Sequence, residues 1–286
     1  MRRLSFFSFF PIAVLSVFLS MGIISSCSLL GSKSETEITF DSLRIDSIVP
    51  LFAGNQEPAI TFNISLQKPV GGTAEQRDAI TELINSLASY GTYFGQVVPD
   101  LDLMINAFIE DRTSNYFDEC GSLTPEDVVS NPWCNYAEML EGTYLGNYSG
   151  FLSYQMKRYM YAGGAHGQTI FTYGVLDMTT LQRVNLANLV DDATEEAITE
   201  LLHQKLAELF DADSFETLLR DEVIFPDAEV TLTENFWFSP EGITWLYNAY
   251  DIACYAIGDI SVTLSWDELQ PLLPVESVAM RVYANS

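Results

Sequence analysis

The sequence predicts an α+β fold, in which antiparallel β-sheets pack against helices. Segments with the alternating pattern of β-strands occur in runs near the start of the chain and again in its last third. Helical segments separate these runs without the regular βαβ order that a doubly wound parallel sheet requires. The chain has 286 residues, of which 48% are hydrophobic, and this is enough for two consecutive α/β modules. We expect the first module at 38–180 and the second at 181–286.

Residues 1–27 predict a bacterial lipoprotein signal peptide. Arg2 and Arg3 precede an apolar run, and small residues at the end of that run lead to Cys27, a pattern similar to a lipobox. Cleavage would make Cys27 the lipid-carrying N-terminus, followed by a polar tether at 28–37. The alternative is an uncleaved transmembrane anchor, because the apolar run approaches the roughly 20 residues that a span needs. The expected location is the cell envelope, anchored by lipid outside the cytoplasmic membrane, at the outer membrane or facing the periplasm.

The charge balance is strongly acidic. The chain has 13 Lys and Arg against 39 Asp and Glu, a net charge of −26. Loss of Arg2 and Arg3 with the signal peptide would make it 11 − 39 = −28. A nucleic-acid partner is not expected, because phosphate contacts need a basic face. The charge favours a cationic partner, although a solvated surface that only maintains solubility is the simpler interpretation.

The first module is expected to begin with two strands and a helix. Residues 38–49 are rich in β-forming side chains, and 60–66 alternate between apolar and polar side chains, as a half-buried strand does. Thr73 and Gln76 then have the spacing of a capping box. This spacing predicts a helix that Gly91 ends.

A second helix is expected from Pro99, followed by a long surface excursion at 112–141 that contains a short helix from Pro125. Such an excursion is either a decorative insertion or a place for binding residues. It carries Cys120 and Cys134, which can pair in an oxidising compartment and would then stabilise the fold by about 3 kcal/mol. Two unpaired buried thiols are the alternative, because connectivity does not follow from sequence.

The most distinctive stretch is 154–177, in which two aromatic, alternating runs flank a compact turn. It predicts a hairpin whose structural turn residues are Gly163, Gly164 and Gly167. The candidate ligand or partner contacts are His166, Tyr161 and Tyr159.

His166 has two interpretations. Flanking glycines would allow its ring to project from the strand end as a ligand contact or an acid/base. Alternatively, the ring binds a neighbouring backbone carbonyl and fixes the hairpin. A lone histidine without a nucleophile, base or metal partner is weak support for catalysis, which favours the structural interpretation.

The second module is expected to contain a long helix and several strands. The helix would begin at Asp192 with Glu195 as its capping partner, and His203, which lies off the apolar stripe, would be exposed. Ser265 and Glu268 have the same capping spacing and predict a short helix. Strands are expected at 230–238, 243–250, 260–264 and 275–283.

Most enzyme signatures are absent from the sequence, including the phosphate-binding loop, the dinucleotide fingerprint and the His-Glu-x-x-His motif. With His166 and His203 as the only imidazoles, a histidine-rich zinc site is not expected. The many carboxylates make calcium chemically possible, but no EF-hand loop is present, and we expect neither a metal site nor a cofactor. Cys254, between Ala253 and Tyr255, is expected to be a small core residue. A catalytic carboxylate pair stays open, because 39 acidic residues offer many pairs.

Two motifs resemble known families. The segment 161–167 (YAGGAHG), followed by a strand, resembles the domain of unknown function 4163. The segment from Asp192 to Leu273 resembles the domain of unknown function 3298. The residues that match the second family's Tyr-x-Ile-Ala-x-Tyr-Ala-x-Gly element are Tyr250, Ile252, Ala253, Tyr255, Ala256 and Gly258. Cys254 departs from the pattern, since proline is frequent there.

Members of these families occur in cell-envelope proteins, including a lysozyme-sensing anti-sigma factor and a peptidoglycan deacetylase. The resemblance implies a binding module in the envelope. Together with the lipobox and the acidity, it predicts a lipid-anchored, non-enzymatic binding protein with the membrane as one partner. Its ligand would be a lysozyme-like cationic protein or a peptidoglycan fragment. The alternatives are an envelope glycan hydrolase that uses a carboxylate pair and a purely structural lipoprotein.

Overall fold

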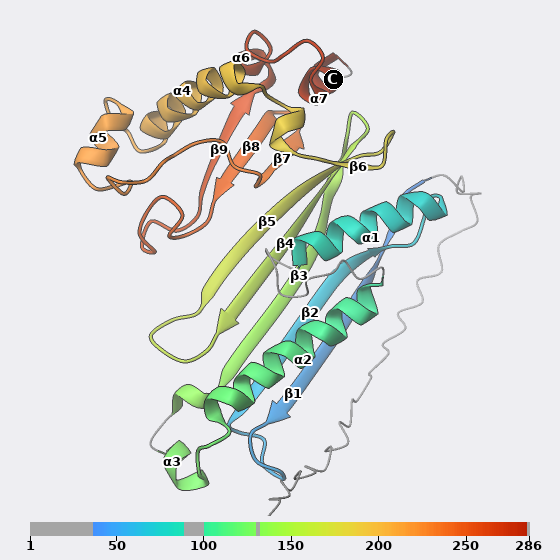
Figure 1. Ribbon diagram of the computed structural model, residues 1–286, viewed down its shortest axis with the longest axis vertical. Helices are drawn as coiled ribbons and strands as arrows, with labels where there is room; N and C mark the ends of the chain where they lie inside the picture. Colours follow the sequence, from blue (N-terminus) through green and yellow to red (C-terminus); the bar gives the residue numbers. More distant parts are fainter. Residues whose placement is uncertain (1–36, 89–99, 130–131, 285–286) are drawn as a thin grey trace, which may run out of the picture. The chain divides into compact units, whose positions relative to one another are not determined.

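A computed structural model describes residues 37–88, 100–129 and 132–284, all within one compact unit at 32–286 (Figure 1). The expected signal peptide, nearly all of the tether, Pro99 and Gly91 lie outside the described residues. The predicted α+β class is confirmed, with antiparallel sheets and packed helices. No helix in the part of the chain that the structure describes is long and apolar enough to cross a membrane.

The larger sheet has six strands in the order β1-β2-β3-β4-β5-β6. Its strands are β1 (Phe40–Pro50), β2 (Ala59–Pro69), β3 (Tyr136–Tyr148), β4 (Phe151–Tyr161), β5 (Gln168–Asp177) and β6 (Gln182–Val184). Every neighbouring pair is antiparallel except β2 and β3, which are parallel. A parallel pair needs a long crossover, and helices α1 (Ala74–Ala88) and α2 (Leu101–Cys120) lie in this connection.

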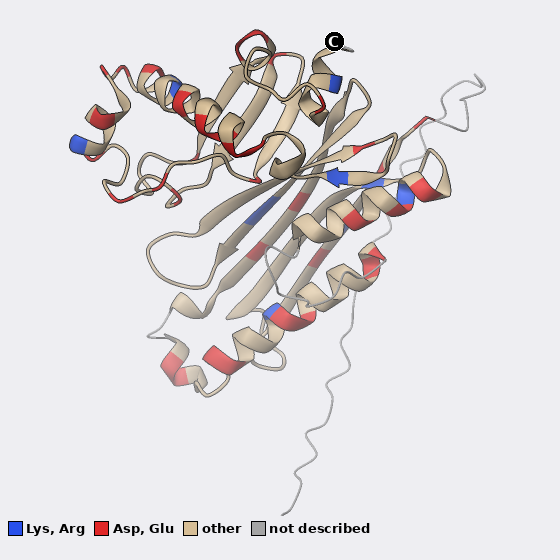
Figure 2. Cartoon of the chain, turned by 45° about the horizontal axis from the view of Figure 1, so that its top comes forward, with Lys and Arg blue, Asp and Glu red and all other residues tan. Residues whose placement is uncertain are grey.

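Helices α1 and α2 cover one face of this sheet (Figure 1). The apolar residues of β2 face them and are buried: Ile60, Phe62, Ile64 and Leu66. The Thr73–Gln76 capping box at the start of α1 is confirmed by reciprocal hydrogen bonds of 2.9 and 3.2 Å. The side of α2 away from the sheet is acidic (Figure 2), with Asp102, Glu110, Asp118 and Glu119 exposed. The helix layer therefore closes the core and presents negative charge to solvent.

The predicted surface excursion at 112–141 is wrong at both ends. Helix α2 continues to Cys120, and β3 already begins at Tyr136. Between them lie α3 (Pro125–Val129), where a short helix was expected, and the 3-10 turn η1 (Pro132–Cys134). The last turns of α2 are polar, but Tyr116 and Cys120 lie one turn apart and are both fully buried. Tertiary burial of one narrow stripe thus extends a helix that the local pattern does not indicate.

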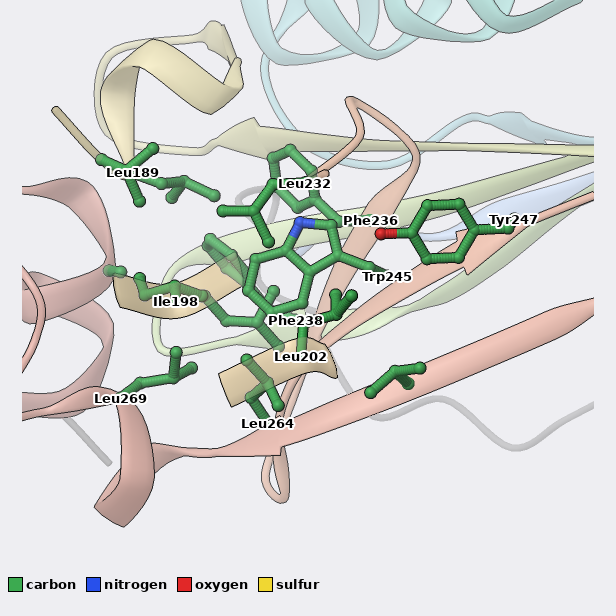
Figure 3. Close-up of a cluster of buried hydrophobic side chains, with 14 of the residues drawn as sticks. Leu189, Ile198, Leu202, Leu232, Phe236, Phe238, Trp245, Tyr247, Leu264 and Leu269 are labelled. Atoms are coloured by element: carbon green, nitrogen blue, oxygen red, sulfur yellow. The ribbon is translucent and has the colours of Figure 1, made fainter. Parts of the chain in front are cut away.

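The smaller sheet has three antiparallel strands in the order β7-β8-β9: β7 (Phe236–Ser239), β8 (Gly242–Tyr247) and β9 (Ile260–Ser265). The helices of this region are η2 (Leu186–Asn188), α4 (Asp192–Leu209), α5 (Phe215–Arg220), α6 (Trp266–Leu269) and α7 (Val278–Ala284). Figure 3 shows the core that these elements share around Trp245, whose side chain is fully buried. The same cluster includes Phe151 and Val175 of the larger sheet, so the two sheets are joined by apolar packing.

Four expectations for this region need correction. The segment 275–283 is largely the helix α7, because Ala279 and Val282 are buried at helical spacing. Residues 230–235 are not strand, and β7 begins only at Phe236. The cap of α4 is one residue earlier than expected, since the Asp191 side chain accepts a hydrogen bond from the Thr194 N–H.

His203 is the fourth correction, because its ring is not freely exposed. It stacks on Phe215 with centroids 3.8 Å apart, and its Nε2 lies 2.7 Å from the Val230 carbonyl oxygen. The Ser265–Glu268 capping box, in contrast, is confirmed at the start of α6.

Two asparagines join the smaller sheet to the edge of β5. The Asn248 Oδ1 accepts a 2.7 Å hydrogen bond from the Phe171 N–H, and its Nδ2 donates to the Phe171 carbonyl. The Asn235 Oδ1 accepts from the Tyr173 N–H at 2.7 Å, and its Nδ2 also donates to the Phe171 carbonyl. Strand β6 pairs only with 175–177, so these side chains satisfy the β5 edge that β6 leaves open.

We expect Asn248→Ala to destabilise the protein by about 1–3 kcal/mol, because it leaves the part-buried N–H and carbonyl of Phe171 without this partner. Denaturant unfolding would measure the loss. Asn63→Ala is the control, since Asn63 is exposed and bonded only to Asp46, and it should change stability by no more than about 0.5 kcal/mol. Equal effects of the two substitutions would contradict this account of the junction.

Candidate functional site

The glycine turn joins β4 to β5 and has tight geometry. Gly163 and Gly164 have φ angles of +82° and +93°, a region that favours glycine. The Tyr161 hydroxyl donates a 3.1 Å hydrogen bond to the Gly164 carbonyl. A Cβ added at Gly167 would overlap the ring of Tyr159, so the ring would have to move to admit any larger residue. The structure therefore places Tyr159 and Tyr161 as supports of the turn.

His166 lies at the exposed surface of this turn. Its Nδ1 is 2.9 Å from the Gly167 carbonyl oxygen, which is the backbone contact of the structural interpretation. Its ring also stacks on Tyr255, with centroids 4.0 Å apart and planes at 16°. The Tyr255 hydroxyl donates to the same Gly167 carbonyl at 3.2 Å. The turn and the Tyr250–Gly258 motif therefore meet at one point.

An exposed apolar surface surrounds this meeting point. Tyr250, Tyr255 and Ile257 are 51%, 39% and 40% exposed, and the two tyrosine rings are 5.7 Å apart. We call the set of His166, Tyr250, Tyr255 and Ile257 the tyrosine ledge. Tyr250 has a φ of +77°, which is unfavourable for a bulky side chain and is typical of functional loops.

Acidic side chains fix the loop that carries the ledge. The Asp251 Oδ2 accepts a 2.7 Å hydrogen bond from the Asn248 N–H, and the Asp259 Oδ1 accepts one of 2.9 Å from the Ala249 N–H. Both aspartates are exposed, so the loop that carries the rings also carries two negative charges at the surface. The loop is thus rigid at its base and apolar at its surface.

Of the expected contacts, only His166 belongs to the ledge. The sequence indicated Tyr250 and Tyr255 only as matches to a family pattern, and no contact between them and the turn was expected. Cys254 is exposed in this loop, so its expected place in the core is wrong. The turn of the loop directs the Cys254 side chain to solvent, while its neighbour Ala253 is buried.

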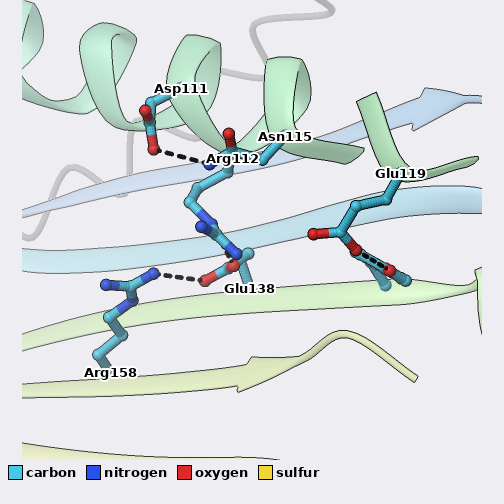
Figure 4. A network of polar contacts seen from close by, with 7 residues as sticks. Asp111, Arg112, Asn115, Glu119, Glu138 and Arg158 are labelled. Atoms are coloured by element: carbon cyan, nitrogen blue, oxygen red, sulfur yellow. Dashed lines mark hydrogen bonds and ion pairs between the residues drawn. The ribbon is translucent and has the colours of Figure 1, made fainter. Parts of the chain in front are cut away.

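A cluster of buried ion pairs lies between α2 and the larger sheet (Figure 4). Glu138 is 3% exposed and pairs with Arg112 at 2.6 Å and with Arg158 at 3.5 Å. The Arg158 guanidinium also lies 5.3 Å from the centre of the Phe108 ring. Two cations compensate one buried carboxylate here, which is an arrangement for holding strands and α2 together rather than for acid/base work.

Hydrogen bonds lower the pKa of two ion-paired carboxyl groups, those of Glu268 and Asp177. Hydrogen bonds from Lys205 and then Ser265 lower the pKa of Glu268 to about 2. Burial by itself would raise the pKa of Asp177, but hydrogen bonds from Arg281 and two backbone N–H groups lower it overall. Within the described ranges, no group of three or more His, Cys, Asp or Glu side chains is placed to hold a metal ion.

The fold and the ledge define an α+β protein with an exposed aromatic surface at the junction of two sheets. The family described as Protein of unknown function (DUF3298) matches residues 187–267, so the predicted resemblance to domain 3298 is confirmed for that segment. The resemblance of the preceding module to domain 4163 stays a prediction. No curated protein matches the chain.

Solved structures with a similar fold include two from this family. One, a member of the DUF3298 family from Bacteroides fragilis NCTC 9343, is 24% identical with a TM-score of 0.74, covering 88% of this chain and 100% of that one. The other, a DUF3298 family protein from Pseudomonas aeruginosa PAO1, is 17% identical with a TM-score of 0.57, covering 85% and 98%. At these identities the likeness concerns the fold alone.

The low pKa of Glu268 predicts that the stability of the fold falls at acidic pH. The folded-state pKa of Glu268 lies below its usual 4.5, so its stabilising effect is present above pH 4.5 and is lost as the pH falls towards 2. Lys205→Met removes the largest cause of the low pKa, so the variant should lose less stability than the parent between pH 4.5 and 2. Urea midpoints across this range measure the difference.

Glu208→Gln is the matched control, because it removes the more exposed partner of Lys205 and leaves the Lys205–Glu268 pair of 2.8 Å intact. Its acid sensitivity should match that of the parent. If Glu208→Gln changes the pH dependence as much as Lys205→Met, the assignment to Glu268 is wrong.

Proposed function

We propose that the chain is a lipid-anchored, non-enzymatic binding protein of the bacterial cell envelope, and that it binds a cationic protein of the lysozyme kind. The observation that carries this proposal is the tyrosine ledge, whose exposed tyrosine rings lie in a loop that also carries two exposed aspartates, Asp251 and Asp259. Protein interfaces commonly have an aromatic centre and a polar rim. The signal-peptide pattern ending at Cys27 and the resemblance to envelope proteins support the location.

The distribution of charge supports a cationic partner. Six basic side chains of the described part form ion pairs with carboxylates of the same chain: Arg112, Lys157, Arg158, Lys205, Arg220 and Arg281. With 39 acidic and only 13 basic residues in the chain, these pairs leave a large excess of negative charge. Such a field raises the association rate of a cationic protein at low salt.

The ledge also suits basic side chains of a partner. A Lys or Arg over the face of Tyr250 or Tyr255 would gain cation–π attraction, and the carboxylates of Asp251 and Asp259 lie in the same loop. The rings expose apolar area without many rotamers to immobilise, which favours binding.

A peptidoglycan fragment is the second candidate, and the same observation favours it. The Tyr250 and Tyr255 rings are tilted by 30°, and their exposed faces could stack on the C–H faces of sugar rings. The salt dependence of binding separates the two candidates. Binding of an uncharged glycan surface responds weakly to ionic strength, whereas salt screens the attraction between the acidic chain and a cationic protein and so weakens their binding. A glycan hydrolase is less well supported, because the buried carboxylate of Glu138 is paired with Arg112 and Arg158, and that of Asp177 is paired with Arg281.

Titration calorimetry of the compact unit 32–286 with lysozyme tests the proposal. We expect binding at low salt that weakens as salt is raised. Tyr250→Ala should weaken it by at least about tenfold, as expected for an interface hot spot worth about 1.4 kcal/mol or more. No heat at low salt would refute the cationic-protein partner.

Phe117→Ala is the control for the ledge, because Phe117 is 40% exposed but lies on α2. Binding by this variant should match that of the parent. If Phe117→Ala and Tyr250→Ala weaken binding equally, the ledge is not the contact surface.

A further inference from the structure

Two cysteines that are 14 positions apart in sequence meet in the core under the larger sheet. Cys120 is the last residue of α2, and Cys134 ends the 3-10 turn that precedes β3. Both are free thiols, both are fully buried, and both belong to the same apolar cluster. Tyr116 lies one turn before Cys120 on α2 and binds the Cys134 carbonyl, so the two cysteines are held close together.

Two tyrosines enclose the thiols. The Tyr116 hydroxyl donates a 2.9 Å hydrogen bond to the Cys134 carbonyl, and the Tyr116 and Tyr136 rings are 5.0 Å apart. The Tyr136 hydroxyl in turn donates to Glu119 at 2.5 Å. A metal site does not account for the pair, since no third His, Cys, Asp or Glu of the described residues completes one. Two thiols held close together can be oxidised to a disulfide in an oxidising compartment.

We propose that Cys120 and Cys134 form a structural disulfide that closes while the chain folds and is shielded afterwards. Each thiol loses its proton, the pair gives up two electrons, and the S–S bond forms. A small-molecule or protein disulfide accepts the two electrons and two protons and becomes two thiols. The proposal rests on the envelope location of the proposed function, because disulfides persist in oxidising compartments, but not on its partner.

The timing follows from burial. The thiolate is the species that attacks a disulfide. Burial, and then the hydrogen bond with Cys134, raise the pKa of Cys120 to about 11. The thiolate is therefore rare in the folded core, and an oxidant has no access to it. Exchange is fast only before α2 and β3 have closed over the pair.

The link would tie the end of α2 to the turn before β3, and these two elements also share the Arg112–Glu138 ion pair. It would close a loop of 15 residues, 120–134. Closing a loop of this length with a disulfide should raise the thermal midpoint of a domain of this size by about 6–12 °C relative to the reduced chain.

The test uses the full chain in mild detergent, unfolded with reductant and refolded in a glutathione redox buffer of extracytoplasmic poise. Free thiols are alkylated in denaturant, and the chain is cut after glutamates without reductant. Cleavage after Glu119, Glu126 and Glu138 gives peptides 120–126 and 127–138, one cysteine in each. We expect these peptides to be joined, and to separate on reduction. Separate, alkylated peptides would overturn the proposal.

Two variants control the assignment. Cys254→Ser removes the exposed thiol and should leave the joined peptides and the thermal midpoint unchanged. Cys120→Ser should abolish the link and lower the midpoint to that of the reduced parent. A link from either peptide to the peptide that contains Cys254 would also overturn the pairing.

A second experiment tests when the disulfide forms. The chain is first folded with reductant and is then moved to the redox buffer, and the rate of disulfide formation is measured. The link should form at least about tenfold more slowly than during refolding, because both thiols are buried. Equal rates would refute the shielding. The same digest, applied to chain that a bacterium has exported, tests the compartment. Peptides that are joined after refolding but separate in the exported chain would overturn the proposed envelope location. This outcome does not bear on the lysozyme titration.

Discussion

The backbone edge of β5 is the constraint on which the arrangement of the two sheets depends. A buried N–H or C=O without a partner is costly, and β6 is too short to cover the start of β5. Asn235 and Asn248 supply side-chain amides that replace a missing strand at Phe171 and Tyr173. Side-chain amides are suited to this because each carries both a donor and an acceptor.

The same junction creates the candidate site. Asn248 lies at the start of the β8–β9 loop, so its bonds to β5 bring that loop alongside the glycine turn. Tyr255 then reaches the Gly167 carbonyl, a contact between residues 88 positions apart. Stacking of Tyr173 on Trp237 at 4.2 Å supports the junction from the neighbouring position. The ledge is thus a consequence of how the β5 edge is satisfied.

Local physics decided which parts of the fold were predictable from sequence. The alternation in β2 and the capping boxes at Thr73 and Ser265 were confirmed, because each signal involves residues within a few positions of one another. The end of α2 was missed, because its helical state depends on burying two residues, Tyr116 and Cys120, against distant strands. The helix at 278–284 was missed because short apolar runs suit strands and helices equally well.

The site was predictable only in part, for the same reason. His166 was evident because a histidine among glycines is unusual within one turn. That Tyr250 and Tyr255 lie beside it required the long-range bonds of Asn248, which leave no periodicity in the sequence. Likewise, Cys254 is small and flanked by apolar residues, so its sequence context resembled a core position although its loop holds it outside.

Support from both sides explains why Tyr250 can be exposed in an unfavourable backbone conformation. Its N–H bonds to the Ala253 carbonyl at 3.0 Å, and Asp251 and Asp259 bind backbone N–H groups at the base of the loop. Strain of this kind persists only where surrounding contacts fix the chain. A loop that is already ordered has little conformational entropy left to lose when a partner binds. The rigid junction and the exposed rings are therefore two parts of one arrangement, because the hydrogen bonds that satisfy β5 also hold the ledge ready for contact.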